Sequence, residues 1–161
     1  MSSRIVCASV TLIVAGVASA GAQQRQGTIV TPAEVAWPAK TTGGVGTSGA
    51  SGIQTVVLTG DPTKPGLYTL RLRAAPGMRI QAHSHRDDRS ALVVSGTWYF
   101  GYGKQFDEKA LKALPPGSFY TEPGGVDHFA MTKDEVVIQI TGYGPSSTTY
   151  VDPANDSART R

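Results

Sequence analysis

Short runs with the alternating pattern of β-strands, separated by turn signals, dominate the chain from Ile53 onward. The run LYTLRLRA at 67–74 sets leucines against threonine and arginine at every second position, and EVVIQIT at 135–141 alternates valine and isoleucine with more polar residues. Turn-forming stretches such as GDPTKPG, APG, SGT, PPG and EPGG lie between the runs. Many short strands with this punctuation are typical of a sandwich or barrel. The pattern therefore predicts an all-β domain.

One segment departs from the strand pattern. FDEKALKAL at 106–114 places Phe106, Ala110 and Leu114 at helical spacing, with an acidic residue four positions before a basic one. This spacing predicts one short surface helix between two halves of the β domain.

The N-terminal end of the chain has a different composition. Residues 1–22 contain Arg4, then an apolar run, then the small residues ASAGA, which is the pattern of a secretory signal peptide cleaved after Ala20 or Ala22. The apolar run is shorter than the roughly 20 residues that a membrane-spanning helix needs, so no membrane span is expected after cleavage. The sequence thus predicts an exported protein, periplasmic or secreted.

The rest of the chain divides into three parts. Residues 23–52, rich in Gly, Ser, Thr and Ala, predict a flexible N-terminal segment, 53–150 the β domain, and 151–161 a disordered tail. The single cysteine, Cys7, lies in the predicted signal peptide, so disulfides and thiolate chemistry are excluded from the mature protein. The formal net charge of +3 comes without a basic run, so nucleic acid is not an expected partner.

The three histidines of the chain stand in an informative pattern. His83 and His85 are two residues apart, so on a strand they share a face, together with Gln81. His128 follows a Pro-Gly turn and opens the apolar run HFAM, which reads as another strand. Imidazoles that meet inside a barrel suit iron, manganese, nickel, copper and zinc alike. We therefore expect the histidines to hold one divalent transition metal, and Gln81 to hydrogen-bond a bound water or ligand.

Two stretches resemble the motifs of the cupin superfamily. GMRIQAHSHRDDRSALVVSG at 77–96 is similar to the first motif, which runs Gly, five residues, His-x-His, three or four residues, Glu, six residues, Gly. GSFYTEPGGVDHFAMT at 117–132 is similar to the second, Gly, five residues, Pro-x-Gly-x-x-His, three residues, Asn. The positions in register are Gly77, His83, His85, Gly96, Gly117, Pro123 and His128.

What the resemblance implies is a cupin-type double-stranded β-helix, a jelly-roll barrel, over roughly residues 53–150, with a metal held near one mouth. The resemblance also implies a homodimer, because proteins with a cupin fold often form dimers. More narrowly, the chain resembles a group of small exported single-domain cupins, most of which have no assigned reaction.

The chain departs from the first motif at Arg89, which stands where the family usually has its glutamate ligand. A guanidinium stays protonated and cannot ligate a cation, which leaves three interpretations open. In the first, three histidines hold the metal, as in cupin dioxygenases that also lack the glutamate, and Arg89 binds an anionic substrate, most simply a carboxylate. In the second, Asp87 or Asp88 supplies the carboxylate through a β-bulge. In the third, Arg89 is a buried ion-pair partner of Glu122 or an aspartate, without chemistry.

The expected function is metal-dependent chemistry on a small organic molecule. A divalent ion polarises substrate oxygens, so a dioxygenase-like oxidoreductase or an isomerase fits the predicted site. Tyr120 is a further candidate for substrate binding and Glu122 a candidate general base. The alternative is a non-catalytic module that binds a metal or a small ligand, and the sequence leaves this choice open.

Overall fold

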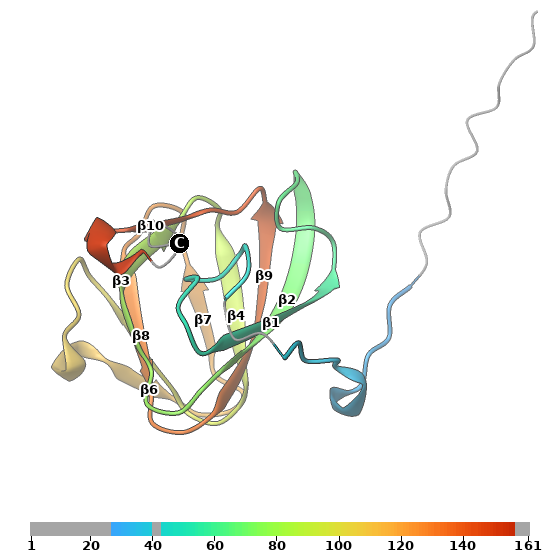
Figure 1. The fold of residues 1–161 in the computed structure, drawn as a ribbon, viewed down its shortest axis with the longest axis horizontal. Helices are drawn as coiled ribbons and strands as arrows, with labels where there is room; N and C mark the ends of the chain where they lie inside the picture. The colour runs from blue at the N-terminus through green and yellow to red at the C-terminus, as the bar shows by residue number, and fades with distance from the viewer. Residues whose placement is uncertain (1–26, 40–42, 157–161) are drawn as a thin grey trace, which may run out of the picture.

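The structure, a computed structural model, describes residues 27–39 and 43–156 (Figure 1). The predicted signal peptide and residues 157–161 of the predicted tail lie outside the described residues. Within the described part, ten strands form two five-stranded antiparallel sheets. One sheet has the order β1 (Ile53–Thr59), β2 (Gly66–Ala74), β9 (Val136–Gly144), β4 (Arg89–Ser95), β7 (Phe119–Glu122). The other has the order β10 (Thr148–Tyr150), β3 (Arg79–His85), β8 (His128–Thr132), β5 (Trp98–Tyr102), β6 (Lys112–Leu114).

The two sheets face each other across one hydrophobic core. From β3 onward the chain switches sheets at almost every strand, and β5 and β6 are the exception because they pair within one sheet. Alternating side chains of each strand point inward, as β2 shows with Leu70, Leu72 and Ala74 all buried. The opposite sheet contributes Trp98 and Phe100 to the same core. The expected all-β jelly-roll architecture is therefore confirmed.

The segment predicted as a surface helix is shorter than expected. It contains a single 3-10 turn, η2 (Glu108–Ala110), in which the Asp107 carboxylate accepts a hydrogen bond from Lys109 N. The next residues, Lys112–Leu114, form strand β6 because Leu114 pairs with Trp98 on β5 and is buried there. Burial of Leu114 at a sheet edge thus outweighs the helical spacing. Two further 3-10 turns are η1 (Pro32–Glu34) and η3 (Pro153–Asn155).

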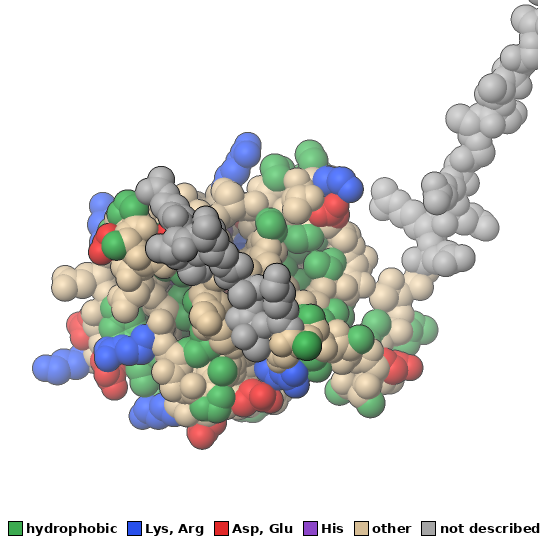
Figure 2. Space-filling view, viewed as in Figure 1, with side chains coloured by type: hydrophobic (Ala, Val, Ile, Leu, Met, Phe, Trp, Pro, Cys, Tyr) green, Lys and Arg blue, Asp and Glu red, His purple; other side chains and the backbone are tan. Residues whose placement is uncertain are grey.

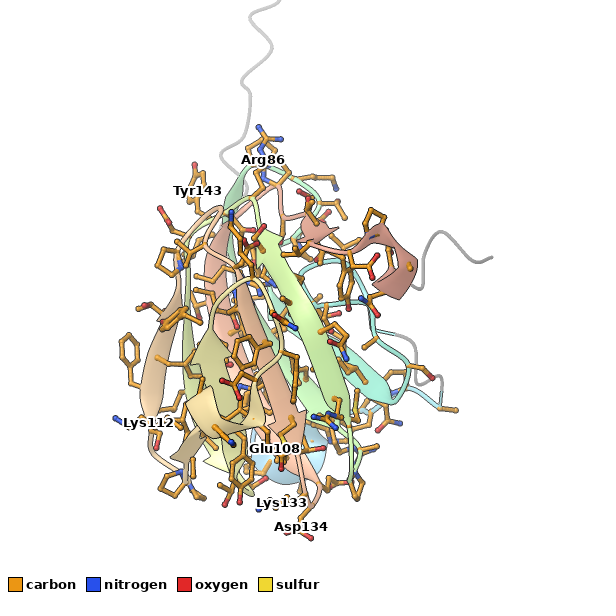
Figure 3. The ribbon with its side chains drawn as sticks, turned by 90° about the vertical axis from the view of Figure 1, so that its left-hand side faces the viewer. Arg86, Glu108, Lys112, Lys133, Asp134 and Tyr143 are labelled. Carbon is orange, nitrogen blue, oxygen red and sulfur yellow. The ribbon has the colours of Figure 1, made fainter. Side chains whose placement is uncertain are left out.

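The two ends of the barrel are well separated (Figure 3). Arg86 and Tyr143 mark one end, and Lys133 and Asp134 mark the other. Arg86 directly follows His85, the last residue of β3, so the histidines lie toward the first end. Among the described residues, no helix is long and apolar enough to cross a membrane.

Candidate metal centre

The three histidines converge on one point inside the barrel. His83 and His85 come from β3, and His128, the first residue of β8, is the cross-strand partner of His83. One ring nitrogen of each lies within 4.8 Å of the corresponding atoms of the other two. All three side chains are buried, with 2–4% of their surface exposed. On the face seen in Figure 2, no histidine is visible among the described residues.

A β-bulge in β3 sets which of its side chains reach the cavity. Ile80 pairs with Ala130 and His83 pairs with His128. Between these two pairs β3 therefore contains one residue more than β8. A bulge of this kind breaks the alternation of faces. Ile80, His83 and His85 line the cavity, whereas the Gln81 side chain is half-buried and does not. The predicted role of the Gln81 side chain as a ligand-binding group is thus not supported by its position.

Backbone carbonyls fix the ring orientation of two histidines. His83 Nδ1 lies 2.7 Å from the carbonyl oxygen of Gln81, and His128 Nδ1 lies 3.0 Å from that of Val126. A carbonyl only accepts, so each Nδ1 carries the proton and donates it. In a neutral imidazole the other nitrogen, Nε2, then has a free lone pair. Nδ1 of His83 and Nδ1 of His128 are turned to the strand backbone. The nitrogen left to face the cluster in each ring is therefore Nε2.

Thr148 fixes the third ring in the same way. Its hydroxyl donates to the carbonyl of Thr47 at 2.7 Å, so its oxygen is left to accept from His85 Nδ1 at 3.1 Å. Nε2 of His85 and Nε2 of His128 are buried and have no hydrogen-bond partner among the described residues. The sequence did not reveal Thr148, because it lies in a polar run, SSTTY, without a recognisable pattern.

Burial keeps the three imidazoles neutral. It lowers the pKa of His83 to about 3, with a further contribution from His128, and it lowers the pKa of His85 well below the ordinary value, helped by the charge of Arg89. The pKa of His128 is lowered by burial as well. Neutral imidazoles whose second nitrogen donates to an oxygen are the form in which histidine binds metals. The cluster therefore fits a divalent transition metal.

Arg89 and Glu122 form a buried ion pair beside the histidines. They are cross-strand neighbours on β4 and β7, and both are 4% exposed. Arg89 Nη2 donates to Glu122 Oε2, while Nη1 donates to the carbonyl of Gly46 at 2.6 Å. Burial raises the pKa of Glu122, but the charge and the hydrogen bond of Arg89, together with His128 and His83, outweigh it, so the pKa is lowered. Of the three interpretations of Arg89, this geometry matches the ion pair with Glu122.

The aspartates of the second interpretation take other roles. Asp87 Oδ2 accepts a hydrogen bond from the hydroxyl of Tyr68 at 2.6 Å. Asp88 is exposed and accepts from Gly124 N at 2.8 Å. Neither belongs to the converging group, and neither lines its cavity. The positions of the two aspartates therefore do not support the expectation of an aspartate ligand, because one oxygen of each carboxylate accepts a hydrogen bond from another group.

The cavity at the histidines is small. Its polar lining consists of the three histidines, Arg89, Glu122, Thr47 and Ser48, and its floor is apolar. Its volume is about 20 Å³. That is room for one water molecule or ion and not for an organic substrate. Tyr120 does not line it and packs with its ring centre 4.4 Å from that of Phe100. A direct substrate contact by Tyr120 is thus not supported.

Residues 43–52, which we call the closing segment, border the cavity through Thr47 and Ser48. Figure 1 shows this segment running beside the strands of the barrel. Three successive carbonyls, of Gly46, Thr47 and Ser48, accept hydrogen bonds at 2.6–2.8 Å from the side chains of Arg89, Thr148 and Tyr150. Thr47 and Ser48 are 3% and 8% exposed. This part of the predicted flexible segment therefore contacts the barrel through its backbone carbonyls, and Ala50 packs against the hydrophobic core.

Thr148→Val is expected to lower the affinity for a divalent metal by about 10- to 100-fold, because His85 loses the oxygen that orients its ring. Thr149→Val is the matched control, since Thr149 is the exposed neighbour on the same strand. Competition with a chelator of known affinity measures both variants. Equal affinities for the two variants would show that the Thr148 hydroxyl does not orient the site.

Comparison with known proteins supports the fold. No protein-family model and no curated protein matches this sequence. A salicylate 1,2-dioxygenase from Pseudoaminobacter salicylatoxidans, solved with gentisate, superposes with a TM-score of 0.51 at 14% identity, covering 62% of this chain and 29% of that chain. This chain thus spans less than a third of the length of the dioxygenase. KdgF from a Halomonas species superposes with a TM-score of 0.52 at 20% identity, over 74% of this chain and 96% of its own.

A third solved structure is a protein of unknown function with a cupin-like fold from Ralstonia eutropha. It is 26% identical over 60% of this chain and 57% of its own, with a TM-score of 0.48. The structural neighbours are cupin-fold proteins, and the two with the higher TM-scores establish the architecture of this chain as a cupin-type jelly roll. At these identities the likeness concerns the fold alone.

Proposed function

We propose that this chain is a mononuclear metalloprotein in which His83, His85 and His128 hold one divalent transition-metal ion through Nε2. A single observation carries the proposal: three neutral imidazoles, each with Nδ1 tied to an oxygen, bring one ring nitrogen each into a buried group whose atoms lie within 4.8 Å of one another. Iron, manganese, nickel, copper and zinc all accept such ligands. The N-terminal sequence motivates the further proposal that the protein is exported.

We further propose that the metal centre acts on a small anionic organic molecule, as a dioxygenase-like oxidoreductase or an isomerase. A bound divalent ion supplies a Lewis acid for substrate oxygens. Arg89 is the cationic group of the chain at this site, and its Nη1 donates to Gly46 in the closing segment. If the closing segment lifts, that N–H becomes available to an anionic group of a substrate. The salicylate 1,2-dioxygenase, which has a similar fold, was solved with gentisate, which is a small organic acid.

The small cavity favours a second candidate function, a module that binds a metal without turnover. Because about 20 Å³ admits no organic molecule, catalysis requires the closing segment to move away from the histidines. A site that never opens would store or sense an ion and would perform no reaction. The two functions therefore differ in whether the closing segment opens to a substrate.

The proposed function is tested by elemental analysis of the untagged full chain beside His83→Ala. We expect close to one equivalent of a single transition metal in the wild type and its loss in the variant, because His83 supplies one of three ligands. Oxygen uptake and product analysis with small carboxylates and diketones then follow. If His83→Ala loses the metal and the metal-loaded wild type turns over none of these substrates, the binding module is favoured. Metal absent from a folded wild type, also after reconstitution, would contradict a metal site at these histidines.

A further inference from the structure

Glu122 presents a carboxylate oxygen to histidine nitrogens that carry no proton. Its Oε2 lies 3.8 Å from Nε2 of His85 and 3.8 Å from Nε2 of His128. The hydrogen bonds at Nδ1 leave a lone pair on each Nε2, and 3.8 Å is beyond hydrogen-bond reach in any case. Electron-rich atoms thus face one another in a buried space without a donor between them. A cation shared by all of them removes this repulsion.

The spacing of these atoms is close to that of ligands around one ion. Donor atoms at 2.0–2.2 Å from a divalent metal lie roughly 3.0–3.5 Å from one another in octahedral or tetrahedral geometry. The Oε2 to Nε2 separations of 3.8 Å exceed this by only a few tenths of an ångström. Glu122 lies outside the group of ligand atoms that are within 4.8 Å of one another, so its carboxylate must rotate inward, toward His83, to reach an ion held by all three histidines.

Charge balance points to the same role. Arg89 donates to the very oxygen, Oε2, that faces the histidines. A divalent ion at the histidines would otherwise share a buried cavity with an unscreened guanidinium, and like charges repel strongly where the effective dielectric constant is low. With Glu122 between them, the carboxylate compensates both cations. Carboxylate ligands of metals are commonly hydrogen-bonded in this manner by an outer partner.

The strand register makes this arrangement a built feature of the barrel. Glu122 is the last residue of β7 and faces Arg89, the first residue of β4, as its direct cross-strand partner. Both side chains point into the cavity that the three histidines line. The carboxylate therefore reaches the site from β7, while the aspartates that immediately precede Arg89 in the sequence are held elsewhere.

We propose that Glu122 is the fourth protein ligand of the metal, so that the centre has three histidines and one carboxylate. This inference rests on the proposed metal binding by the histidines. Four protein ligands fill a tetrahedral site, whereas a six-coordinate ion keeps two positions open for small ligands. The same assignment removes Glu122 from the set of free general bases, because its carboxylate is shared between the metal and Arg89.

Cobalt(II) titration of the full chain tests the assignment, because its visible absorption reports ligand number and its affinity is measured against a chelator. Glu122→Gln keeps the shape of the side chain and removes its charge. We expect it to weaken cobalt binding at least tenfold, the lower end of losses seen even for outer-shell partners, and to change the absorption spectrum. The matched control is Asp87→Asn, which also converts a buried carboxylate to an amide at this end of the barrel and leaves affinity and spectrum unchanged.

The double variant Arg89→Gln/Glu122→Gln covers the case in which Glu122→Gln alone does not fold, because it leaves no unpaired charge. It is expected to show the same weakened binding and altered spectrum. A crystal structure of the zinc-loaded wild type gives a test without any substitution. An Oε2 to zinc distance of about 2.0–2.2 Å is expected. Water in that position, with Oε2 beyond coordination distance, overturns the proposal.

The outcomes separate the two proposals. If the wild type binds no cobalt, the metal site fails and the Glu122 assignment fails with it. If the wild type binds cobalt, His128→Ala abolishes binding, and Glu122→Gln keeps wild-type affinity and spectrum, the three-histidine site stands and Glu122 is not a ligand.

Discussion

Arg89→Met is expected to lower the free energy of unfolding of the metal-free protein by about 3–5 kcal/mol, because it leaves an ionised carboxylate buried without its partner. Glu122 is 4% exposed, and the charge of Arg89 is the largest of the effects that lower the pKa of its carboxyl group against burial. Methionine has a similar length and fills the space of the arginine stem. Urea denaturation in the presence of a chelator measures the loss.

The double variant Arg89→Met/Glu122→Met is expected to recover most of that loss. Replacing both members of a buried ion pair by apolar residues is often neutral or stabilising. If the double variant is as unstable as Arg89→Met, the ion pair does not explain the loss. The hydrogen bond from Arg89 Nη1 to Gly46 in the closing segment would then be the important contact.

His128→Ala is expected to abolish the stabilisation of the protein by a divalent metal. A ligand that binds only the folded state stabilises it by about 2.7 kcal/mol at a concentration one hundred times its Kd. For a domain of about 100 residues, that corresponds to a rise in Tm of about 10–20 °C in the wild type. Thermal unfolding with and without the metal, zinc or cobalt for example, measures the rise and its loss.

Gln81→Ala is the control for this measurement. It keeps the backbone carbonyl that accepts from His83 Nδ1 and removes a side chain that does not line the cavity. We expect Gln81→Ala to show the full metal-dependent rise in Tm. A full rise in His128→Ala would place the ion elsewhere, and a lost rise in Gln81→Ala would assign the side chain a role that its position does not suggest.

The fold was predictable because the strand pattern is strong along most of the domain. Alternation in stretches such as Gly66–Ala74 and Val136–Gly144 depends on side chains alone, and both stretches are strands. The convergence of His83, His85 and His128 was also predictable, from the spacing of the first two and the turn before the third. The bulge between Ile80 and His83 was not, because it arises from the pairing of β3 with β8 and leaves no mark on the alternation itself.

The contacts that define the rest of the site depend on long-range register. Glu122 reaches Arg89 across 33 positions of sequence, and Thr148 reaches His85 across 63. The sequence therefore left three interpretations of Arg89 open, and the pairing of β4 with β7 adds the contact with Glu122 that the sequence did not reveal. The contacts of the closing segment left no signal in the sequence for a different reason. Composition reports which side chains can be buried, whereas three of these contacts are made by backbone carbonyls.

If the three histidines hold an ion, as proposed, the closing segment also governs how fast that ion exchanges with the surroundings. Three hydrogen bonds between its carbonyls and buried side chains must break before the cavity opens, and two of them join residues 101 and 102 positions apart. Local openings of this kind are rarer than the fluctuations of a free loop. The residence time of a bound ion would then report the lifetime of the closed segment rather than the strength of the coordination bonds. Such a centre retains its ion kinetically, even against a chelator that binds the ion more tightly.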